Sequence, residues 1–280
     1  MNHRLTTPPA RNEHSVSPDF EAITATQQET WSTGDFHQIA RQNVCMAEAL
    51  CEAVDPHAGE RVLDIACGSG TAALVAARRY CEVSGIDYVP ELIERARLRA
   101  EADDLGVDFR VGDAQALPYE DGSFDVVLSV YGIQFAPNQE KAASELLRVM
   151  RPGGRIALAS PISEGWSGDF FATNARHVPP PPGIHPPLRW GTDRGLEELL
   201  SAGTRSIRSE KRTALQYYRS VEHAVDLFLT YFGPAIRASK ADTGRQLRDD
   251  LRRVFERHNR ATDGTAVIEN TYLLTTAVRA

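Results

Sequence analysis

Cysteine, the residue that builds disulfide frameworks and many zinc sites, is scarce in this chain. The 280 residues include only four cysteines, which are Cys45, Cys51, Cys67 and Cys81. They have no C-x-x-C spacing and no adjacent pair of histidines, so the pattern favours reduced, buried thiols over a zinc site. We therefore expect no bound metal.

Long apolar runs and an excess of positive charge are also lacking. No run approaches the roughly 20 residues of a transmembrane helix, and the N-terminus has no apolar stretch typical of a signal peptide. Lys and Arg are scattered and the net charge is −7, whereas a nucleic-acid-binding surface needs a basic face. We expect a cytoplasmic protein, a monomer or homodimer, without membrane or nucleic-acid partners.

The most informative segment is Val62–Thr71, which predicts a strand followed by a tight turn of small residues. The apolar residues within Ala72–Ala77 are spaced for one face of a helix. A turn without large side chains lets a ligand touch the backbone, and the helix offers it free N–H groups and a positive end. Many α/β proteins have such a turn, so taken alone it also fits a purely structural role.

Four more predicted strands follow in order. Cys81–Ile86 ends in Asp87, and an acid at that point can hold both hydroxyls of a ribose bound across the first turn. Pro90 opens the next helix, as proline does at a first turn. The remaining predicted elements are strands at Val107–Val111, Phe124–Ser129 and Arg155–Ser160, a helix from Gln139 to about Met150, and a turn at Pro152–Gly154.

Together these segments resemble the class I S-adenosylmethionine (SAM)-dependent methyltransferases over roughly residues 62–160. Within that family the chain is similar to the small-molecule enzymes that include the ubiquinone and menaquinone methyltransferases. Ala66 stands where the family often has its first glycine, and its side chain is small enough for close approach of the cofactor. The resemblance is carried by the motifs Asp64-x-Ala-Cys-Gly-Ser-Gly, Gly85-Ile-Asp-Tyr, Gly112-Asp-Ala-Gln-Ala-Leu-Pro, Ser123-Phe-Asp-Val-Val-Leu-Ser and Leu147-Arg-Val-Met-Arg-Pro-Gly-Gly.

The resemblance implies an α/β Rossmann-like fold with a doubly wound, seven-stranded, mostly parallel sheet. We expect a disordered leader at residues 1–18 and a single methyltransferase domain at 19–280. The last two predicted strands are Thr204–Tyr218 and Val267–Val278. About 50 residues separate them, too many for a loop without its own structure, so we expect a helical cap there. The expected parts of the domain are a helical lid at 19–54, a SAM-binding core at 55–160, and an acceptor half at 161–280 with cap helices at about 221–259.

Further details of these parts are also expected from the residues. The prolines of Val178–Pro187 favour a stiff connector over the active site rather than a signalling ligand. Trp31 and Phe36, in the lid, are interpreted as core packing. Gly233-Pro234 is placed to break or bend a predicted helix over Val221–Lys240, and a second cap helix is expected near Asp242–Asn259.

The resemblance also assigns cofactor contacts by motif position. Ala66 and Gly68 should contact the methionine part of SAM through their backbone, with Asp64 shaping the turn. Asp87 should bind the ribose hydroxyls, and Tyr88 should lie against the adenine.

Further contacts are implied after the third and fourth strands. Asp113 should accept a hydrogen bond from the adenine amino group, although it could instead serve only as a turn former. The Ala114 N–H should donate to an adenine ring nitrogen. Ser129, Val130 and Tyr131 should line the sulfonium, with Gln134 also within reach.

Methyl transfer from a sulfonium is an in-line displacement that requires alignment, exclusion of water and removal of a proton from a hydroxyl acceptor. It requires neither a metal nor a covalent enzyme intermediate. No catalytic residue is therefore assigned from the sequence. The candidates are His37, Tyr131 and His177.

Aromatic residues are concentrated in the lid and in the acceptor half. Such walls suit an apolar or aromatic small molecule and can favour the sulfonium by cation–π attraction. The candidates for contact with the acceptor are Trp166, Phe170, Trp190, Tyr231 and Phe232.

The sequence thus predicts SAM-dependent methyl transfer to a small, apolar or aromatic acceptor, with release of S-adenosylhomocysteine. Two alternatives retain the cofactor: a SAM-binding cyclase or pericyclase that uses the sulfonium electrostatically, and a non-catalytic SAM-binding partner protein. A dinucleotide-binding dehydrogenase expects G-x-G-x-x-G, whose third glycine would here be Ala73, and it does not require the motifs after the third and before the fifth strand. The acceptor and the choice among O-, N-, C- and S-methylation stay open at this stage.

Overall fold

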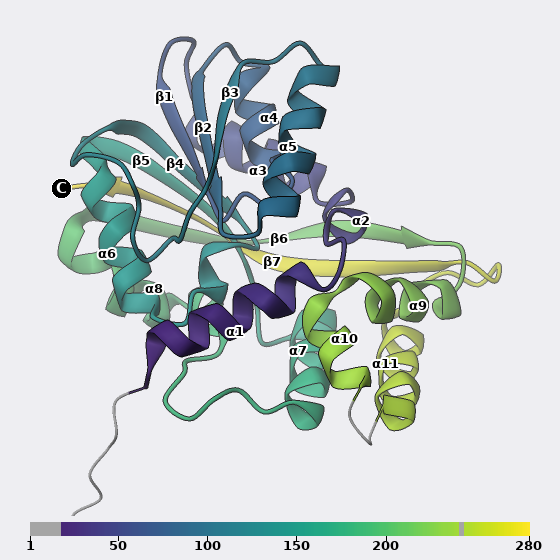
Figure 1. The fold of residues 1–280 in the computed structure, drawn as a ribbon. Coiled ribbons are helices and arrows are strands. Elements are labelled where there is room, and N and C mark those ends of the chain that lie inside the picture. Colours follow the sequence, from purple (N-terminus) through teal and green to yellow (C-terminus); the bar gives the residue numbers. More distant parts are fainter. Residues whose placement is uncertain (1–17, 241–243) are drawn as a thin grey trace, which may run out of the picture.

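The structure, a computed structural model, describes residues 18–240 and 244–280 and is built on one seven-stranded sheet (Figure 1). The strand order is β3-β2-β1-β4-β5-β7-β6. Strands β1 to β5 run parallel, and β7 runs antiparallel to both of its neighbours. This confirms the predicted doubly wound, mostly parallel sheet. The strands are β1 (Arg61–Ile65), β2 (Glu82–Asp87), β3 (Val107–Val111), β4 (Phe124–Val130), β5 (Met150–Pro161), β6 (Thr204–Tyr218) and β7 (Ala266–Arg279).

Helices cover both faces of the sheet because side chains alternate along each central strand. Val62 of β1 packs with the helices of one face and Leu63 with those of the other, and both are fully buried. Burial on two faces explains why these strands are near-continuous apolar runs. The first face carries α3 (Val44–Val54), α4 (Thr71–Ala77) and α5 (Pro90–Ala102), and the second carries α6 (Gln139–Val149) and α8 (Asp193–Leu200).

Helix α4 is buried on every side, although its sequence spacing predicted only one apolar face. All seven of its residues are buried. The sheet lies on one side of α4 and α3 packs on another. The small residues of α4 therefore allow close packing on every side of the helix.

Strand β5 begins earlier than the sequence predicted. The expected turn at Pro152–Gly154 is part of the strand, which starts at Met150. Its pairing with β4 shifts register between Met150 and Arg155, and Gly153 has a φ of 76°. The small, proline-containing segment is thus an irregularity within β5, because the backbone returns to the same pairing partner after it.

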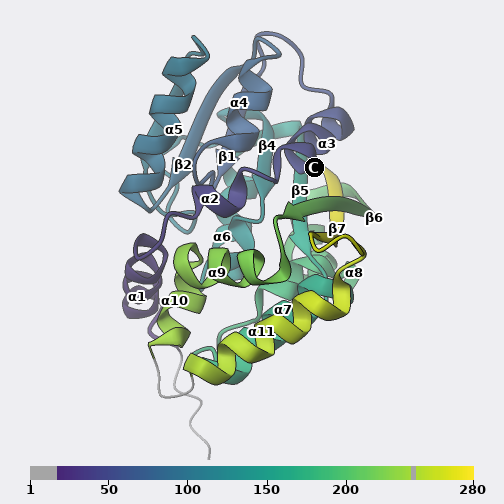
Figure 2. The ribbon, with the colours of Figure 1, turned by 90° about the vertical axis from the view of Figure 1, so that its right-hand side faces the viewer.

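A third layer of helices packs beside the carboxyl ends of the strands (Figures 1 and 2). The predicted helix over Val221–Lys240 is two helices that meet at Phe232, as the Gly233-Pro234 pair indicated. Pro234 lies in the first turn of the second helix, where its missing N–H is not needed. The helices of this layer are α1 (Phe20–Ser32), α2 (His37–Ala40), α7 (Gly165–His177), α9 (Val221–Tyr231), α10 (Gly233–Ser239) and α11 (Gly244–His258).

Helices α1 to α3 occupy the segment expected to form the lid, and α9 to α11 lie between β6 and β7. The expected leader at residues 1–18 falls, apart from Pro18, outside the described residues. Within residues 18–240 and 244–280, no helix combines the length and the apolar character needed to cross a membrane.

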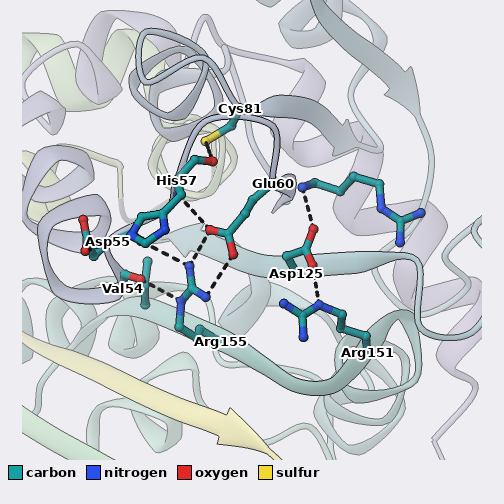
Figure 3. A network of polar contacts seen from close by, with 9 residues as sticks. Val54, Asp55, His57, Glu60, Cys81, Asp125, Arg151 and Arg155 are labelled. Carbon is teal, nitrogen blue, oxygen red and sulfur yellow. Dashed lines mark hydrogen bonds and ion pairs between the residues drawn. The ribbon is translucent and has the colours of Figure 1, made fainter.

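A polar network ties the strands together at their amino ends, on the side of the sheet away from the third layer (Figure 3). Arg155 of β5 donates to both carboxylate oxygens of Glu60, at 2.6 and 3.1 Å, and to the carbonyl of the last residue of α3 at 2.8 Å. Asp125 of β4 accepts from the backbone N–H of Arg61 at 2.7 Å and from Arg151. The amino ends of β1, β4 and β5 are therefore fixed to one another, away from the edge where α1 lies.

Candidate functional site

Three neighbouring cavities follow the carboxyl ends of β1 to β4, beside the point where the strand order reverses between β1 and β4. In doubly wound sheets ligands bind at this position. The first cavity, about 60 Å³, lies against the turn after β1. The second, about 30 Å³, borders the ends of β2 and β3, and the third, about 500 Å³, lies between β3 and α1. Together they mark an elongated ligand site.

The turn after β1 is held by its own side chains and by β2. Asp64 accepts from the backbone N–H of Ala73 at 2.9 Å, which anchors the turn to the start of α4. The Gly68 N–H donates to Asp87 at 2.8 Å. A Cβ at Gly70 would lie 2.6 Å from the ring of Phe109, so this position requires glycine.

Ala66 and Gly132 approach each other across the ends of β1 and β4. Ala66 has a left-handed φ of 52°, which favours the glycine that the family often has there. A Cβ at Gly132 would lie 2.5 Å from the Ala66 carbonyl oxygen and 2.8 Å from Ser129 Oγ. The close approach is therefore provided by Gly132, whose role sequence reasoning missed.

The carboxylates of Asp64 and Asp87 both line the first cavity and are almost fully buried. Burial raises the pKa of Asp64 to about 7 and that of Asp87 to about 6, and the hydrogen bonds from backbone N–H groups offset this only in part. In the described chain no lysine or arginine contributes to either shift. Such a pair favours a positively charged ligand, because a nearby cation stabilises the ionised carboxylates.

The second and third cavities contain the residues implied to hold the adenine. Tyr88 lines all three cavities, Asp113 lines the second and third, and Ala114 lines the second. Asp113 accepts from the backbone N–H of Gln115 at 2.9 Å, which is the turn-forming contact considered as an alternative. The same carboxylate also borders the cavities, so both roles are geometrically compatible.

Helix α1 lies across the strand ends (Figure 1). Two hydrogen bonds fix it there. Gln28 donates to the Tyr88 carbonyl at 2.5 Å. Gln115 donates to Thr24 Oγ1 at 3.0 Å. Farther along, Trp31 and Phe36 line the first cavity, so these two aromatic residues are ligand-site walls as well as packing residues.

Only some of the residues expected around the sulfonium lie at the first cavity. Val130 and Tyr131 line the first cavity. Ser129 does not, because its hydroxyl donates to the Ile65 carbonyl at 2.7 Å and accepts from the Ile133 N–H at 3.0 Å within the core. Gln134 borders none of the three cavities and instead lines a fourth.

The three catalytic candidates have structural partners. Tyr131 donates its hydroxyl to Asn270 at 3.1 Å, and burial raises its pKa, so it stays protonated at neutral pH. His37 lies outside the cavity wall with Nδ1 2.9 Å from Ser69 Oγ, and burial followed by the charge of Arg99 lowers its pKa. His177 faces away and pairs with an aspartate of α11 at 2.9 Å.

Most of the aromatic residues proposed for acceptor contact pack elsewhere. Of the five, Phe232 alone lines one of the four cavities, the fourth. Trp166 and Phe170 stack at 5.1 Å in the core of the third layer, and Trp190 is fully buried under the second face of the sheet. Tyr231 borders none of the four. A single sequence cannot separate core aromatics from wall aromatics, since both are apolar residues on helices.

Other residues of the first cavity were not identified from the sequence. Phe135 follows β4 in the short helix η1 (Ile133–Phe135), and Leu92 comes from α5. Asn43 enters from the break between α2 and α3. Within residues 18–240 and 244–280, no group of three or more His, Cys, Asp or Glu side chains is placed to hold a metal ion.

Comparison with known proteins identifies a matching family and several relatives in sequence. The family described as "Methyltransferase domain" matches residues 63–158. An uncharacterised protein of Mycobacterium tuberculosis is 34% identical over 221 residues, which is 78% of this chain and 81% of that protein. The demethylmenaquinone methyltransferase of Thermus thermophilus is 44% identical over 149 residues, 52% of this chain and 68% of that enzyme.

Solved structures share the fold at low identity. The YcgJ protein of Bacillus subtilis superposes with a TM-score of 0.58 at 20% identity, covering 83% of this chain and 97% of that one. The cyclase SpnF superposes with a TM-score of 0.54 at 21% identity, covering 84% and 80%. At such identities the similarity establishes the architecture alone, since one fold serves several chemistries.

Proposed function

This chain belongs to the class I SAM-dependent methyltransferases, and on that premise we propose that its methyl acceptor is a small apolar or aromatic molecule. The observation that carries the proposal is the wall of the first cavity. Opposite the turn after β1 it consists of Trp31, Phe36, Phe135 and Leu92, and its charged residues are the two carboxylates Asp64 and Asp87. A hydrophobic acceptor gains from this wall, whereas an anionic one would meet like charges.

The residues along the three cavities fit SAM in the assigned order. Ala66 and Gly68 would meet the methionine part, Asp87 the ribose, and Asp113 with the Ala114 N–H the adenine. Asp64 and Asp87 would provide negative charge beside a cationic ligand, which agrees with their burial without a cation of the chain. When bound, SAM supplies a methyl group activated by its sulfonium for in-line displacement.

The chain's own contribution is then positioning and exclusion of water. Aromatic faces near the reacting centre attract a cationic sulfonium. The lid contacts through Gln28 and Gln115 would close the adenine side of the site. Tyr131 uses its hydroxyl on Asn270 and remains protonated, so it is unsuited to act as a base.

None of the three catalytic candidates provides a base in the wall, and the carboxylates of Asp64 and Asp87 already accept hydrogen bonds from backbone N–H groups. This favours acceptors that ionise readily by themselves. Phenols and enols lose their proton near neutral pH more easily than alcohols do, so they need the least help from the protein. The Thermus relative is named for demethylmenaquinone, which fits an acceptor of this general kind.

A panel assay tests the proposed acceptor class. The full chain is incubated with SAM labelled in its methyl group and with matched sets of phenols, aliphatic alcohols, amines and carboxylates. We expect labelled product chiefly from apolar phenols or enols, detected by mass spectrometry. Transfer restricted to amines or to charged, non-aromatic acceptors would contradict the proposal.

A further inference from the structure

A fourth cavity of about 320 Å³ lies beside the first, separated from it by Trp31 and Phe135, which line both. Its volume is in the range of small-molecule sites. Its wall is formed by α1, η1, α7, the proline-rich segment that follows α7, and Phe232 at the junction of α9 and α10. Apart from a few polar groups the wall is apolar, with Phe171 and several prolines in it.

Three amide side chains in this wall have buried polar atoms without a hydrogen-bond partner in the described chain. Gln134 has both its oxygen and its nitrogen unpartnered, and Asn174 and Gln27 each have their oxygen unpartnered. Gln134 is 1% exposed and Asn174 is 9% exposed. Buried polar groups are normally paired, so these atoms indicate a missing partner.

The three amides come from elements far apart in the sequence. Gln27 is on α1, Gln134 on η1 and Asn174 on α7, and they converge on one cavity. The orientation of Asn174 is fixed, because its nitrogen donates to the Phe170 carbonyl at 2.9 Å and leaves its oxygen free. An apolar cavity with a few convergent polar groups is the usual form of a small-molecule site.

The free atoms define what the occupant must carry. Three oxygens accept hydrogen bonds and one nitrogen donates, so the occupant must offer hydrogen-bond donors, as hydroxyl groups do. The wall contains no Asp or Glu, and its basic residues His185 and Arg237 are exposed at the surface. An ammonium group would find no carboxylate there, and the buried part of the wall has no cation for an anion.

The roof of the cavity is fixed to the site. Gln139, at the start of α6, donates to the carbonyls of His185, Pro186 and Gln134, each at 3.2 Å. The proline-rich segment is thereby held against η1, which carries Gln134. This agrees with the expected role of that segment as a stiff connector over the site.

We propose that the fourth cavity binds the body of a neutral, hydroxyl-bearing, largely apolar acceptor, with Gln134, Asn174 and Gln27 accepting hydrogen bonds from its hydroxyl groups. The proposal rests on the proposed function. The Trp31 and Phe135 rings, 5.1 Å apart, stand between this body and the first cavity. One of them must shift for an acceptor atom to reach the methyl group.

The test compares two probes with the same ring, one with two hydroxyl donors and one in which a methyl group replaces each donor hydrogen. Binding of 2,7-dihydroxynaphthalene and 2,7-dimethoxynaphthalene is measured by calorimetry on the full chain saturated with S-adenosylhomocysteine. We expect the dihydroxy probe to bind the wild type more tightly. Q134L and N174L should each weaken that probe by about three- to tenfold, the effect of one neutral hydrogen bond. The dimethoxy probe should change by no more than about twofold.

Two controls keep the outcome interpretable. Q246L makes the same substitution at an exposed position of α11 outside the cavity and should change neither affinity. Q134L should melt at or above the wild-type temperature, because it removes a buried amide that lacks partners. Equal binding of both probes, binding of neither, or no loss in Q134L and N174L would overturn the proposal.

The same variants separate this inference from the function on which it rests. If all of them still transfer a methyl group to phenols with unchanged selectivity, the acceptor class stands and the fourth cavity is not its site. If the wild type transfers to no phenol or enol, the acceptor class itself fails.

Discussion

At the scale of residues, the two buried carboxylates at the ends of β1 and β2 give the site its charge. With the pKa of Asp64 near 7 and that of Asp87 near 6, both bind protons in the ligand-free protein more readily than in the unfolded chain. The stability they contribute is therefore present at low pH and lost as the pH rises from about 4 to about 7. A cationic ligand reverses this, since it favours the ionised forms.

We accordingly predict that SAM affinity increases as the pH rises through 6 and 7, with release of protons on binding. D87A should weaken SAM by a few kcal/mol, because each charge-assisted hydrogen bond to a ribose hydroxyl contributes roughly 1.5–3 kcal/mol. D87N, which keeps the shape, should lose part of the pH dependence. Calorimetry across pH in buffers of different ionisation heat measures both, and an unchanged dissociation constant in D87A would contradict the assignment.

The contact between Ala66 and Gly132 leads to a second prediction. A66G should raise stability by up to about 1 kcal/mol, because the left-handed φ of 52° no longer strains a Cβ and the added backbone freedom offsets part of the gain. G132A should lower it by at least about 2 kcal/mol, since its Cβ would meet backbone at 2.5 Å. Thermal unfolding of the two variants tests the pair, and a harmless G132A would show that the strand ends can separate.

Residues of the turn motifs could be placed from the sequence because they belong to two successive strands and the turn and helix between them. Asp64, Gly68 and Asp87 meet across one turn and one strand pair, and the structure brings them to one cavity. Gln134 could not be placed in this way. Whether the side chain after β4 points to the first or the fourth cavity depends on η1 packing against α1 and the proline-rich segment, which local spacing does not encode.

At the scale of elements, the junction of α9 and α10 separates two adjacent aromatics that the sequence treated alike. Phe232 lines the fourth cavity and packs edge-on against Trp31 at 5.3 Å, whereas Tyr231 borders none of the four cavities. We predict that F232A raises KM for the acceptor or lowers kcat. Y231A is the matched control, and SAM affinity should stay within about twofold in both. If F232A loses both its SAM affinity and its folded state, Phe232 is a core residue and the predicted role in acceptor binding is wrong.

The polar network at the amino ends of the strands should serve stability alone (Figure 3). Burial raises the pKa of Glu60, but hydrogen bonds from Arg155 and the His57 N–H outweigh it, and the net pKa lies below the usual value. Its contribution to stability is therefore present at neutral pH and lost as the pH falls through the acid range.

We predict that R155M destabilises the protein by about 1–3 kcal/mol at pH 7 and by less near pH 4, as expected for hydrogen bonds to a charged group. The SAM affinity of R155M should match that of the wild type within about twofold, because the network lies at the amino ends of the strands and the cavities lie at the carboxyl ends. Urea unfolding at the two pH values and calorimetry give the two readings. A loss of SAM affinity without a loss of stability would contradict this division.

Boundaries of elements were predictable where a local signal set them. Pro90 begins α5, and Phe232 ends the predicted long helix before Gly233-Pro234. The start of β5 was not predictable in this way. Pro152–Gly154 is a turn by composition and becomes part of the strand only through its pairing partners.

At the scale of the whole molecule, the sheet and the cofactor side were predictable because apolar strands and small-residue turns recur in a fixed order from β1 to β5. The acceptor side was not. The proposed acceptor cavity is lined by α1, α7, η1 and the α9–α10 junction, which meet only in three dimensions. The first cavity and the fourth share Trp31 and Phe135, so the proposed acceptor site would be coupled to methyl transfer through these two rings.

We propose that this chain transfers the methyl group of SAM to a neutral phenol or enol without a metal. Mass spectrometry of a complete reaction with methyl-labelled SAM and the best acceptor of the panel, in the presence of EDTA, tests this proposal. We expect one labelled methyl group in the product for each S-adenosylhomocysteine released, at an undiminished rate. A product isomeric with the acceptor and no S-adenosylhomocysteine, or a rate restored only by a divalent ion, would contradict it.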